Sequence, residues 1–205
     1  MELKQAIQEL RKNEKKKFDQ SIDLLVSLKG IDVKKDNITI IGALPHKIRD
    51  KKVCAFLSTK SNLVRTITNL DFPKYKDKKD LKNLIKEFDF FIAEAKLMPS
   101  VATVFGKILG PAGKMPSPQL GVLMNTDDAS IKAILQRMNN AIKIKVKEAA
   151  VKLSVAKESM SDEVVAENIS AAYNAILNAM PVKKDNIKSV MVKLTMSKPI
   201  KVEIK

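Results

Sequence analysis

"KFDQSIDLLVSL", residues 17–28, decides the fold of this chain, because its apolar and polar side chains alternate. Five of the six even-numbered positions carry an apolar group: Phe18, Ile22, Leu24, Val26 and Leu28. The positions between them carry Lys17, Asp19, Ser21, Asp23 and Ser27. A period of two predicts a half-buried β-strand that shows one polar face.

The same alternation of apolar and polar residues is found at the other end of the chain. "AAVKLSVAK" at 149–157 and "IKSVMVKLTM" at 187–196 alternate in the same way, and "IKVEIK" ends the chain as a strand. Amphipathic helices are predicted over 3–16 and 161–180, with a further strand within 36–45. The two chain ends therefore predict one α+β domain built from both.

The middle of the chain has a different pattern of apolar residues. The apolar residues of 51–58 and 88–95 run together, as in strands buried on both faces, and 142–146 reads as another strand. Helical spacing is found near 61–70 and over 100–109 and 125–142, with a lysine-rich connection at 72–80. The fold class predicted is mixed α/β and α+β. A split α+β domain (1–49 and 147–205) carries an inserted, Rossmann-like, three-layer α/β domain (50–146), with a hinge where the chain crosses.

The charge indicates the kind of partner. The 205 residues contain 38 Lys and Arg against 23 Asp and Glu, a net charge of +15 with a pI near 9.8. Because the excess is spread over the whole chain, a folded surface and not a basic tail is expected to meet a polyanion. A thermophilic or high-salt host is the alternative source of the excess lysine. No apolar run of membrane-spanning length and no secretory signal is present, and the single Cys54 indicates a reducing cytosol.

Enzymatic readings find little support. The glycine-rich "GKILGPAGKMPSPQLG" at 106–121 is not a phosphate-binding P-loop, because Ile108 stands where its first glycine belongs and Met115 where its hydroxyl belongs. The chain has a single histidine, His46, and a single cysteine, so the sequence predicts neither a Cys–His catalytic pair nor a cluster of metal ligands. No catalytic residue, cofactor or metal is predicted. A nucleotide-binding α/β enzyme and a DNA-compacting protein are the alternatives to be tested.

The polar strand faces favour RNA over DNA. No helix-turn-helix, zinc-finger or basic-zipper pattern is found, and aromatic residues for base stacking are few. Short polar side chains suit ribose hydroxyls and exposed base edges. The terminal strands supply Ser21, Asp23, Lys152, Ser154, Ser189 and Thr195.

A family resemblance sharpens this reading. "LGPAGKMPSP" at 109–118 resembles the signature of the L-one family of large-subunit ribosomal proteins. "ALPH" at 43–46, "FDFFIAEAKLMP" at 88–99 and "VKLTM" at 192–196 extend the likeness in colinear order, the last two toward the archaeal branch.

The resemblance implies a structural protein of the large ribosomal subunit, in the cytoplasm and away from membranes, that is monomeric off the ribosome. Its implied partners are the stalk of the large-subunit ribosomal RNA, transfer RNA leaving the exit site, and its own messenger RNA, which it represses.

The resemblance also implies the RNA-contacting residues: Lys17, Phe18, Ser21, Asp23, Lys152, Lys157, Ser189, Thr195, Met196 and Ser197. Asp23, Ser189 and Thr195 are expected to be hydrogen-bonded to one another. Phe18 lies at the same alternating positions as the core-facing Ile22 and Leu24, so it either packs at the edge of the core or contacts RNA.

Two residues depart from the family pattern. Ser197 replaces a usual glycine, where a positive φ would be strained, and Asp23 replaces a longer glutamate. Lys198 next to the turn, and Lys107 and Lys114 in the glycine-rich stretch, are further candidate phosphate contacts. Whether that stretch touches RNA or the opposite domain is left open by the residues alone.

Overall fold

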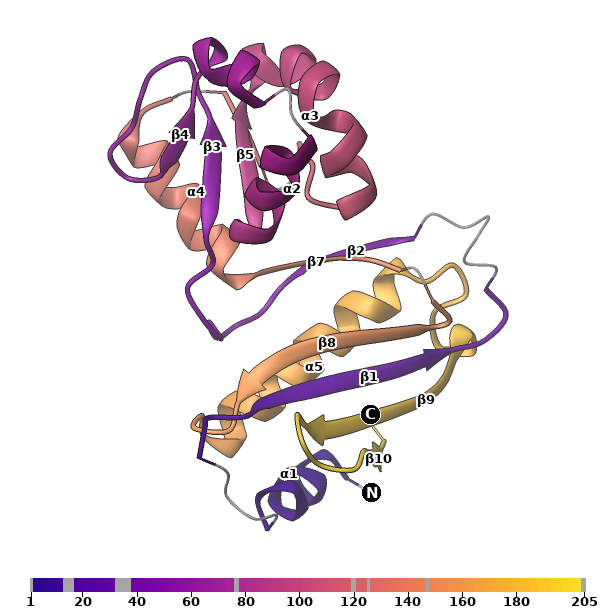
Figure 1. Cartoon of the computed structure of the whole chain (residues 1–205). Helices are drawn as coiled ribbons and strands as arrows, with labels where there is room; N and C mark the ends of the chain where they lie inside the picture. The colour runs from indigo at the N-terminus through magenta and orange to yellow at the C-terminus, as the bar shows by residue number, and fades with distance from the viewer. Residues whose placement is uncertain are drawn as a thin grey trace. The chain divides into compact units, whose positions relative to one another are not determined.

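The computed structural model describes residues 2–12, 17–31, 38–75, 78–118, 121–124, 126–146 and 148–203. The chain divides into two compact units (Figure 1). The terminal unit comprises Met1–Ile48 and Asn140–Lys205, and the inserted unit comprises Arg49–Asn139.

The terminal unit is built on a four-stranded antiparallel sheet of order β10-β9-β1-β8. Its strands are β1 (Ser21–Leu28), β8 (Ala150–Lys157), β9 (Ile187–Leu194) and β10 (Ile200–Val202). Along β1 and β9 buried and part-exposed residues alternate, as the sequence predicts. One face of the sheet is therefore core, and the other is left open.

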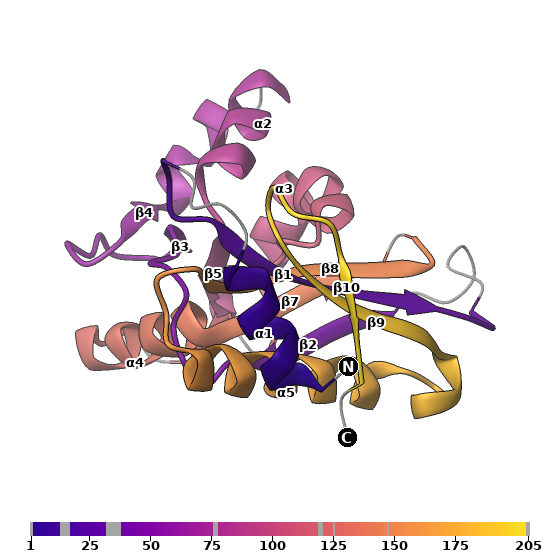
Figure 2. The ribbon, with the colours of Figure 1, turned by 90° about the horizontal axis from the view of Figure 1, so that it is seen from below.

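Two helices cover the buried face. They are α1 (Leu3–Arg11) and α5 (Asp162–Ala179), which pack against each other and against strands β8, β9 and β10 (Figure 2). A two-stranded ribbon of β2 (Thr39–Ala43) and β7 (Ala141–Lys145) also packs on α5. The contact is so close at Gly42 that a Cβ there would lie 2.6 Å from Ala175 Cβ. The short helix η3 (Lys183–Asn186) leads into β9.

The inserted unit has a four-stranded parallel sheet of order β4-β3-β5-β6. Its strands are β3 (Val53–Phe56), β4 (Arg65–Ile67), β5 (Phe90–Glu94) and β6 (Val122–Leu123). One face packs on η1 (Asn69–Tyr75), α2 (Lys78–Glu87) and α3 (Met98–Ala112), which follows the short η2 (Ala95–Leu97). The other face packs on α4 (Asp128–Asn140). Three layers and a parallel sheet confirm the mixed α/β class predicted from the continuous apolar strands.

The unit boundary differs from the expected one at the second crossing. The sequence placed 142–146 in the inserted domain, with the crossing at 147. In the structure β7 pairs with β2 from Thr39↔Lys145 to Ala43↔Ala141, so it belongs to the terminal unit, which resumes at Asn140. A hydrophobic pattern shows that a strand exists but not which strand it pairs with.

Three local predictions were wrong. The helix expected near 61–70 is instead the edge strand β4 followed by η1, since Thr66 and Ile67 pair in parallel with β3. The lysine-rich connection at 72–80 runs into α2, whose buried Leu81 and Leu84 have helical spacing. Helix α3 continues to Ala112, three residues beyond the helix predicted over 100–109 and into the glycine-rich stretch.

Within the part of the chain that the structure describes, no helix has the length and apolar character required to cross a bilayer.

Candidate nucleic-acid interface

The open face of the terminal sheet is the candidate site. Strand β1 is central, so its polar positions meet side chains from β9 on one side and β8 on the other. The cross-strand register sets Ser27 opposite Ser189, Leu25 opposite Met191 and Lys152, and Asp23 opposite Lys193 and Ser154. The face therefore has Leu25 and Met191 at its centre. On one side of them lies the hydroxyl pair of Ser27 and Ser189, and on the other lies a charged row of Ser154, Asp23 and Lys193.

Asp23 lies in that charged row, between two donors. The pKa of its carboxyl is raised by burial, an effect that the charge of Lys193 and a hydrogen bond from Ser154 partly offset. A carboxylate that has lost part of its water shell gains most from a further hydrogen-bond donor. The row thus offers an acceptor flanked by a cation and a hydroxyl, which is the chemistry that ribose and base edges use.

The hydrogen-bonded group expected of Asp23, Ser189 and Thr195 is not formed. Ser189 lies four residues along β9 from Lys193, the partner of Asp23, which is about 13 Å at the rise of a strand. Ser154 of β8 takes the place expected for Ser189. Ser189 remains on the open face, at its other end.

Thr195 is tied to the start of β1. Its hydroxyl accepts from the backbone N–H of Ser21 at 3.2 Å and donates to the Ser21 carbonyl at 3.2 Å. The backbone N–H of Thr195 also donates to that carbonyl, at 3.0 Å. The residue is exposed, so this tie fixes a hydroxyl at the surface.

The turn after β9 closes without the strain expected of Ser197. Among the described residues other than glycine, only Lys183 has a positive φ. The Ser197 hydroxyl accepts from the backbone N–H of Leu194 at 2.9 Å and so closes the turn itself. A serine here serves the turn through its side chain. Met196, next to it, is 68% exposed.

Phe18 does not follow the core parity of its strand. Strand β1 begins at Ser21, and Phe18 lies in the bend before it with 53% of its surface exposed, next to exposed Lys17. The alternative of a packed edge residue is therefore wrong. Its contact with RNA stays a prediction.

The two candidate lysines of β8 lie at opposite ends of that strand's polar side. Lys152 is exposed and its Nζ lies 3.1 Å from Glu148, a weak surface ion pair. Lys157 donates to the Asp19 carbonyl at 3.4 Å, and it is opposite Ser21 in the register. Lys157 therefore belongs to the end of the sheet that also holds Thr195 and Phe18.

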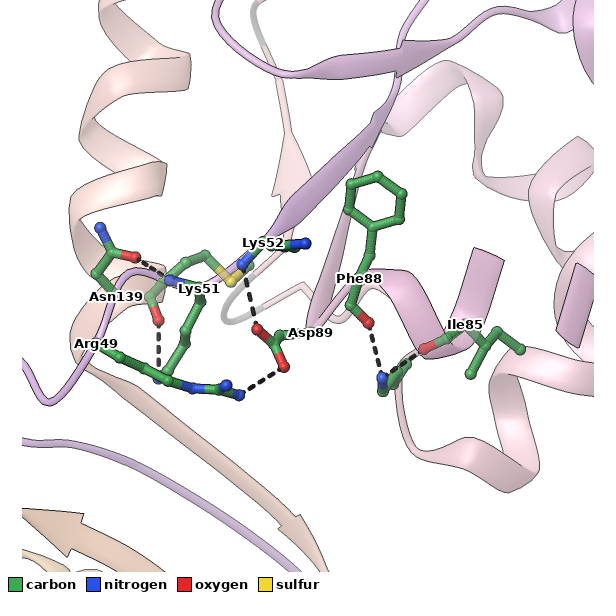
Figure 3. Close-up of polar contacts among 9 residues, drawn as sticks. Arg49, Lys51, Lys52, Ile85, Phe88, Asp89 and Asn139 are labelled. Carbon is green, nitrogen blue, oxygen red and sulfur yellow. Dashed lines mark hydrogen bonds and ion pairs between the residues drawn. The ribbon is translucent and has the colours of Figure 1, made fainter. Parts of the chain in front are cut away.

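The glycine-rich stretch is a helix end and not a phosphate cradle. Gly113, with φ +72°, ends α3, and the bonds Gly113 N–H to Gly110 O and Lys114 N–H to Leu109 O close the end as a Schellman motif. Lys114 then caps a second helix, since its Nζ donates to the carbonyls of Ile85 and Phe88 at 2.7 Å each (Figure 3). Burial lowers its pKa. The weak phosphate contact expected of Lys114 is therefore replaced by a structural role, whereas Lys107 is exposed on α3.

A second lysine caps a helix at the same edge of the inserted sheet. Lys51 donates from Nζ to the carbonyl of Met138, near the end of α4, at 3.1 Å, and its backbone N–H donates to the Asn139 side chain (Figure 3). Its pKa is lowered to about 8, chiefly by burial. Asp89 accepts from Arg49 and from the backbone N–H of Lys52 beside it. These charges stabilise the unit's own helix ends.

The position of the nucleotide crevice of an α/β sheet holds a buried carboxylate here. In such sheets ligands bind beyond the carboxyl ends of the strands where the strand order reverses, which is between β3 and β5. At that point Glu94, 7% exposed, accepts from the Ser58 backbone N–H at 3.1 Å and from its hydroxyl at 2.5 Å. A carboxylate there would repel phosphate. Ile108 and Met115 pack on the core, and no metal-binding cluster is found among the described residues.

Cys54 and His46 have structural surroundings. Burial raises the pKa of the Cys54 thiol to about 12, as for a small core residue. His46 has its Nε2 2.7 Å from Glu167, and its backbone N–H and carbonyl are held by the buried Asn168.

Sequence reasoning missed three residues of this region. Ser154 is predicted to lie on a polar strand face, but it and Lys193 are absent from the predicted contact set, since only the register brings them to Asp23. Gln20 is buried at the end of the sheet. Its signal is a polar residue at a core-facing position of the alternation.

Comparison with known proteins identifies the family of this chain. A profile of the Ribosomal protein L1p/L10e family matches residues 10–198. The chain belongs to this family. Its L1p/L10e relatives include the large ribosomal subunit protein uL1 of Thermofilum pendens, 34% identical over 98% of this chain and 92% of that protein. The uL1 proteins of Pyrococcus horikoshii (32% identical, covering 97% and 94%) and Nanoarchaeum equitans (30%, covering 96% and 97%) are similar.

Proposed function

We propose that this chain is a structural protein of the large ribosomal subunit that binds the subunit's ribosomal RNA through the open face of its terminal sheet. Its membership of the L1p/L10e family makes it a ribosomal protein and not an enzyme. The buried Glu94 carboxylate, where a phosphate would bind in a nucleotide enzyme, supports the same exclusion.

The finer roles are proposed from the family resemblance. The RNA bound is the stalk of the large subunit, the protein takes part in the release of transfer RNA from the exit site, and it represses its own messenger RNA. A net charge of +15 supports a polyanionic partner in each case. The residues predicted to make contact are those at the end of the sheet around Ser21, Thr195 and Met196, together with Asp23 on the face.

The observation that carries the proposal is the row formed by Ser154, Asp23 and Lys193 across three strands. Such a row combines a cation for phosphate with an acceptor and a hydroxyl for sugar and base edges. Because strands from both chain ends supply it, it exists only in the folded terminal unit. A surface of this kind distinguishes RNA from a uniform polyanion.

The test compares two lysines of equal charge. Lys193→Gln removes the cation of the row, and Lys4→Gln removes an exposed cation from α1, on the helical side of the sheet. Affinity for a stalk fragment of large-subunit RNA is measured by fluorescence anisotropy at two salt concentrations. Lys193→Gln is expected to weaken binding by about tenfold, the value of a charge-assisted hydrogen bond, and Lys4→Gln by less than about threefold.

Two further measurements separate the alternatives. Duplex DNA that competes equally with the stalk fragment at moderate salt would favour a DNA-compacting protein, since phosphate-only contacts fail as salt rises. A clear thermal stabilisation by ATP with Mg²⁺ would favour a nucleotide site. Equal losses in the two lysine variants would show that bulk charge, and not this face, binds the RNA.

A further inference from the structure

We infer that Gln20 is a positioning residue that holds the turn Thr195–Ser197 against the start of β1 and so orders the RNA-binding end of the sheet. This rests on the proposed function of that end. Gln20 itself is 2% exposed and has no access to a ligand.

The side chain of Gln20 joins three separate segments of the chain. Its Oε1 accepts from the backbone N–H of Met196 at 3.2 Å, and its Nε2 donates to Glu158 Oε2 at 3.2 Å. Its backbone carbonyl accepts from the N–H of Glu158 at 2.8 Å. Since the N–H can only donate and the carboxylate only accept, these partners settle which way the amide points.

An amide at this position goes against the pattern of the strand. Gln20 precedes Ile22 and Leu24 at the same parity, and all three are buried. An apolar residue would continue the core, while a buried amide costs free energy unless every polar atom is bonded. Both ends of this amide are bonded, to groups outside the strand. The polar side chain therefore serves the neighbouring turns and not the core.

The two turns depend on Gln20 to different degrees. The segment after β8 is also held by Arg11, which donates to the carbonyl of Glu158 at 2.9 Å, and by the Asp19 carboxylate, which accepts from Ser159. At Met196 the bond to Gln20 holds the backbone N–H of a residue whose side chain is 68% exposed. Thr195 and Ser197, on either side, keep their own bonds to Ser21 and Leu194. Loss of Gln20 is therefore expected to free the Met196 amide before it frees the segment after β8.

A loosened turn weakens binding without removing any contact. Exposed Met196 would have to be ordered by the RNA itself, and the cost of ordering such a side chain is about threefold to tenfold in affinity. Preorganisation of this kind acts on the free protein, which loses less conformational entropy on binding, and leaves the rest of the fold in place.

The chain supplies a matched control at the far end of β9. Asn186 is also a buried amide, 5% exposed, that accepts from the Val182 N–H at 2.8 Å and donates to the Lys29 carbonyl at 3.2 Å. It ties loops as Gln20 does, but the length of β9 away, roughly 25 Å at the rise of a strand. It touches none of the candidate RNA residues through these bonds.

The experiment uses the full-length chain. Gln20→Met and Asn186→Leu each replace the amide by an apolar side chain of similar size. Gln20→Glu combined with Glu158→Gln exchanges the two groups, keeps the net charge and restores every donor and acceptor. Binding to the stalk RNA fragment, the thermal midpoint, and hydrogen exchange at the Met196 amide are measured for each.

Gln20→Met is expected to weaken RNA binding by about threefold to tenfold and to speed exchange at the Met196 amide. The exchanged pair should recover both, and Asn186→Leu should change neither. Equal RNA affinity in Gln20→Met and the parent, or an equal loss in Gln20→Met and Asn186→Leu, overturns the inference. Failure of the unsubstituted chain to bind the fragment would instead overturn the proposed function, and the positioning role with it.

Discussion

Thr195→Ala is the sharpest single test of the RNA-binding end. The threonine hydroxyl makes two hydrogen bonds to the backbone of Ser21, each 3.2 Å long, in an exposed position. Alanine removes the hydroxyl and leaves the Ser21 groups open to water, so no buried polar atom is orphaned. The backbone bond from residue 195 to the Ser21 carbonyl, at 3.0 Å, is kept.

The two effects of this change are expected to differ in size. Solvent-exposed bonds of this kind contribute about 0.5–1 kcal/mol to folding, and their loss in a chain of this length lowers the thermal midpoint by about 1–4 °C. A hydroxyl desolvated by RNA is worth more, on the order of 1–3 kcal/mol, or about fivefold to 150-fold in Kd. Binding should therefore suffer while the fold persists.

The assay is titration of a stalk RNA fragment, with circular dichroism to confirm the fold. Thr195→Ser retains the hydroxyl and is expected to bind within about threefold of the parent. Lys114→Ala loses the cap on α2 and should lower the stability of the inserted unit more than RNA affinity. If Lys114→Ala weakens RNA binding more than Thr195→Ala does, the site lies in the inserted unit and the reasoning is refuted.

Three other outcomes follow from single contacts. Gly42→Ala should destabilise the protein by about 1–3 kcal/mol, because its Cβ would lie 2.6 Å from that of Ala175, and Ala175→Gly should restore the thermal midpoint. Burial raises the pKa of Asp23, so its contribution to stability is present at low pH and lost as pH rises through that pKa. Asp23→Asn should therefore gain stability over the parent in urea melts between pH 4 and 7, while binding RNA less tightly. Lys51, with its pKa lowered to about 8 from 10.5, favours folding increasingly as pH rises from 8 to 10.5, and Lys51→Met should lose that rise in melts over this window.

Each of these has an outcome that contradicts it. An Ala175→Gly exchange that leaves the Gly42→Ala defect uncorrected would place the close contact elsewhere. An Asp23→Asn variant less stable than the parent at pH 7 would mean that the carboxylate stabilises the free protein. A parent and a Lys51→Met variant with parallel stability curves would show that the amine does not titrate in the folded state within this window.

The pattern of apolar and polar residues predicted a helix or strand correctly where the element is formed by burying one of its faces. The alternation of Ile22, Leu24 and Val26 predicts β1 because one face of the sheet is core. The same rule misplaced Phe18, since a strand ends where its partners end and not where its pattern ends. It also concealed Gln20, whose burial is compensated by bonds to residues far along the chain.

The glycine-rich stretch also shows that local sequence does not fix where an element ends. The helix predicted over 100–109 stops before Gly110, yet both Gly106 and Gly110 lie in α3, where a Cβ at either would meet open space. The helix tolerates them because its apolar face, with Phe105 and Leu109, is buried against the sheet. Packing outweighed propensity.

By itself the sequence determined the fold class, the use of both chain ends in one domain, and the family resemblance, because these follow from the order of apolar and polar residues along the chain. Only the tertiary structure decided that Asp23 meets Ser154 and Lys193 and not Ser189, that Lys114 caps a helix, and that β7 belongs to the terminal unit. These depend on strand register and on which residues share a helix end. Both are set by contacts between residues distant in the chain, which a local pattern does not record.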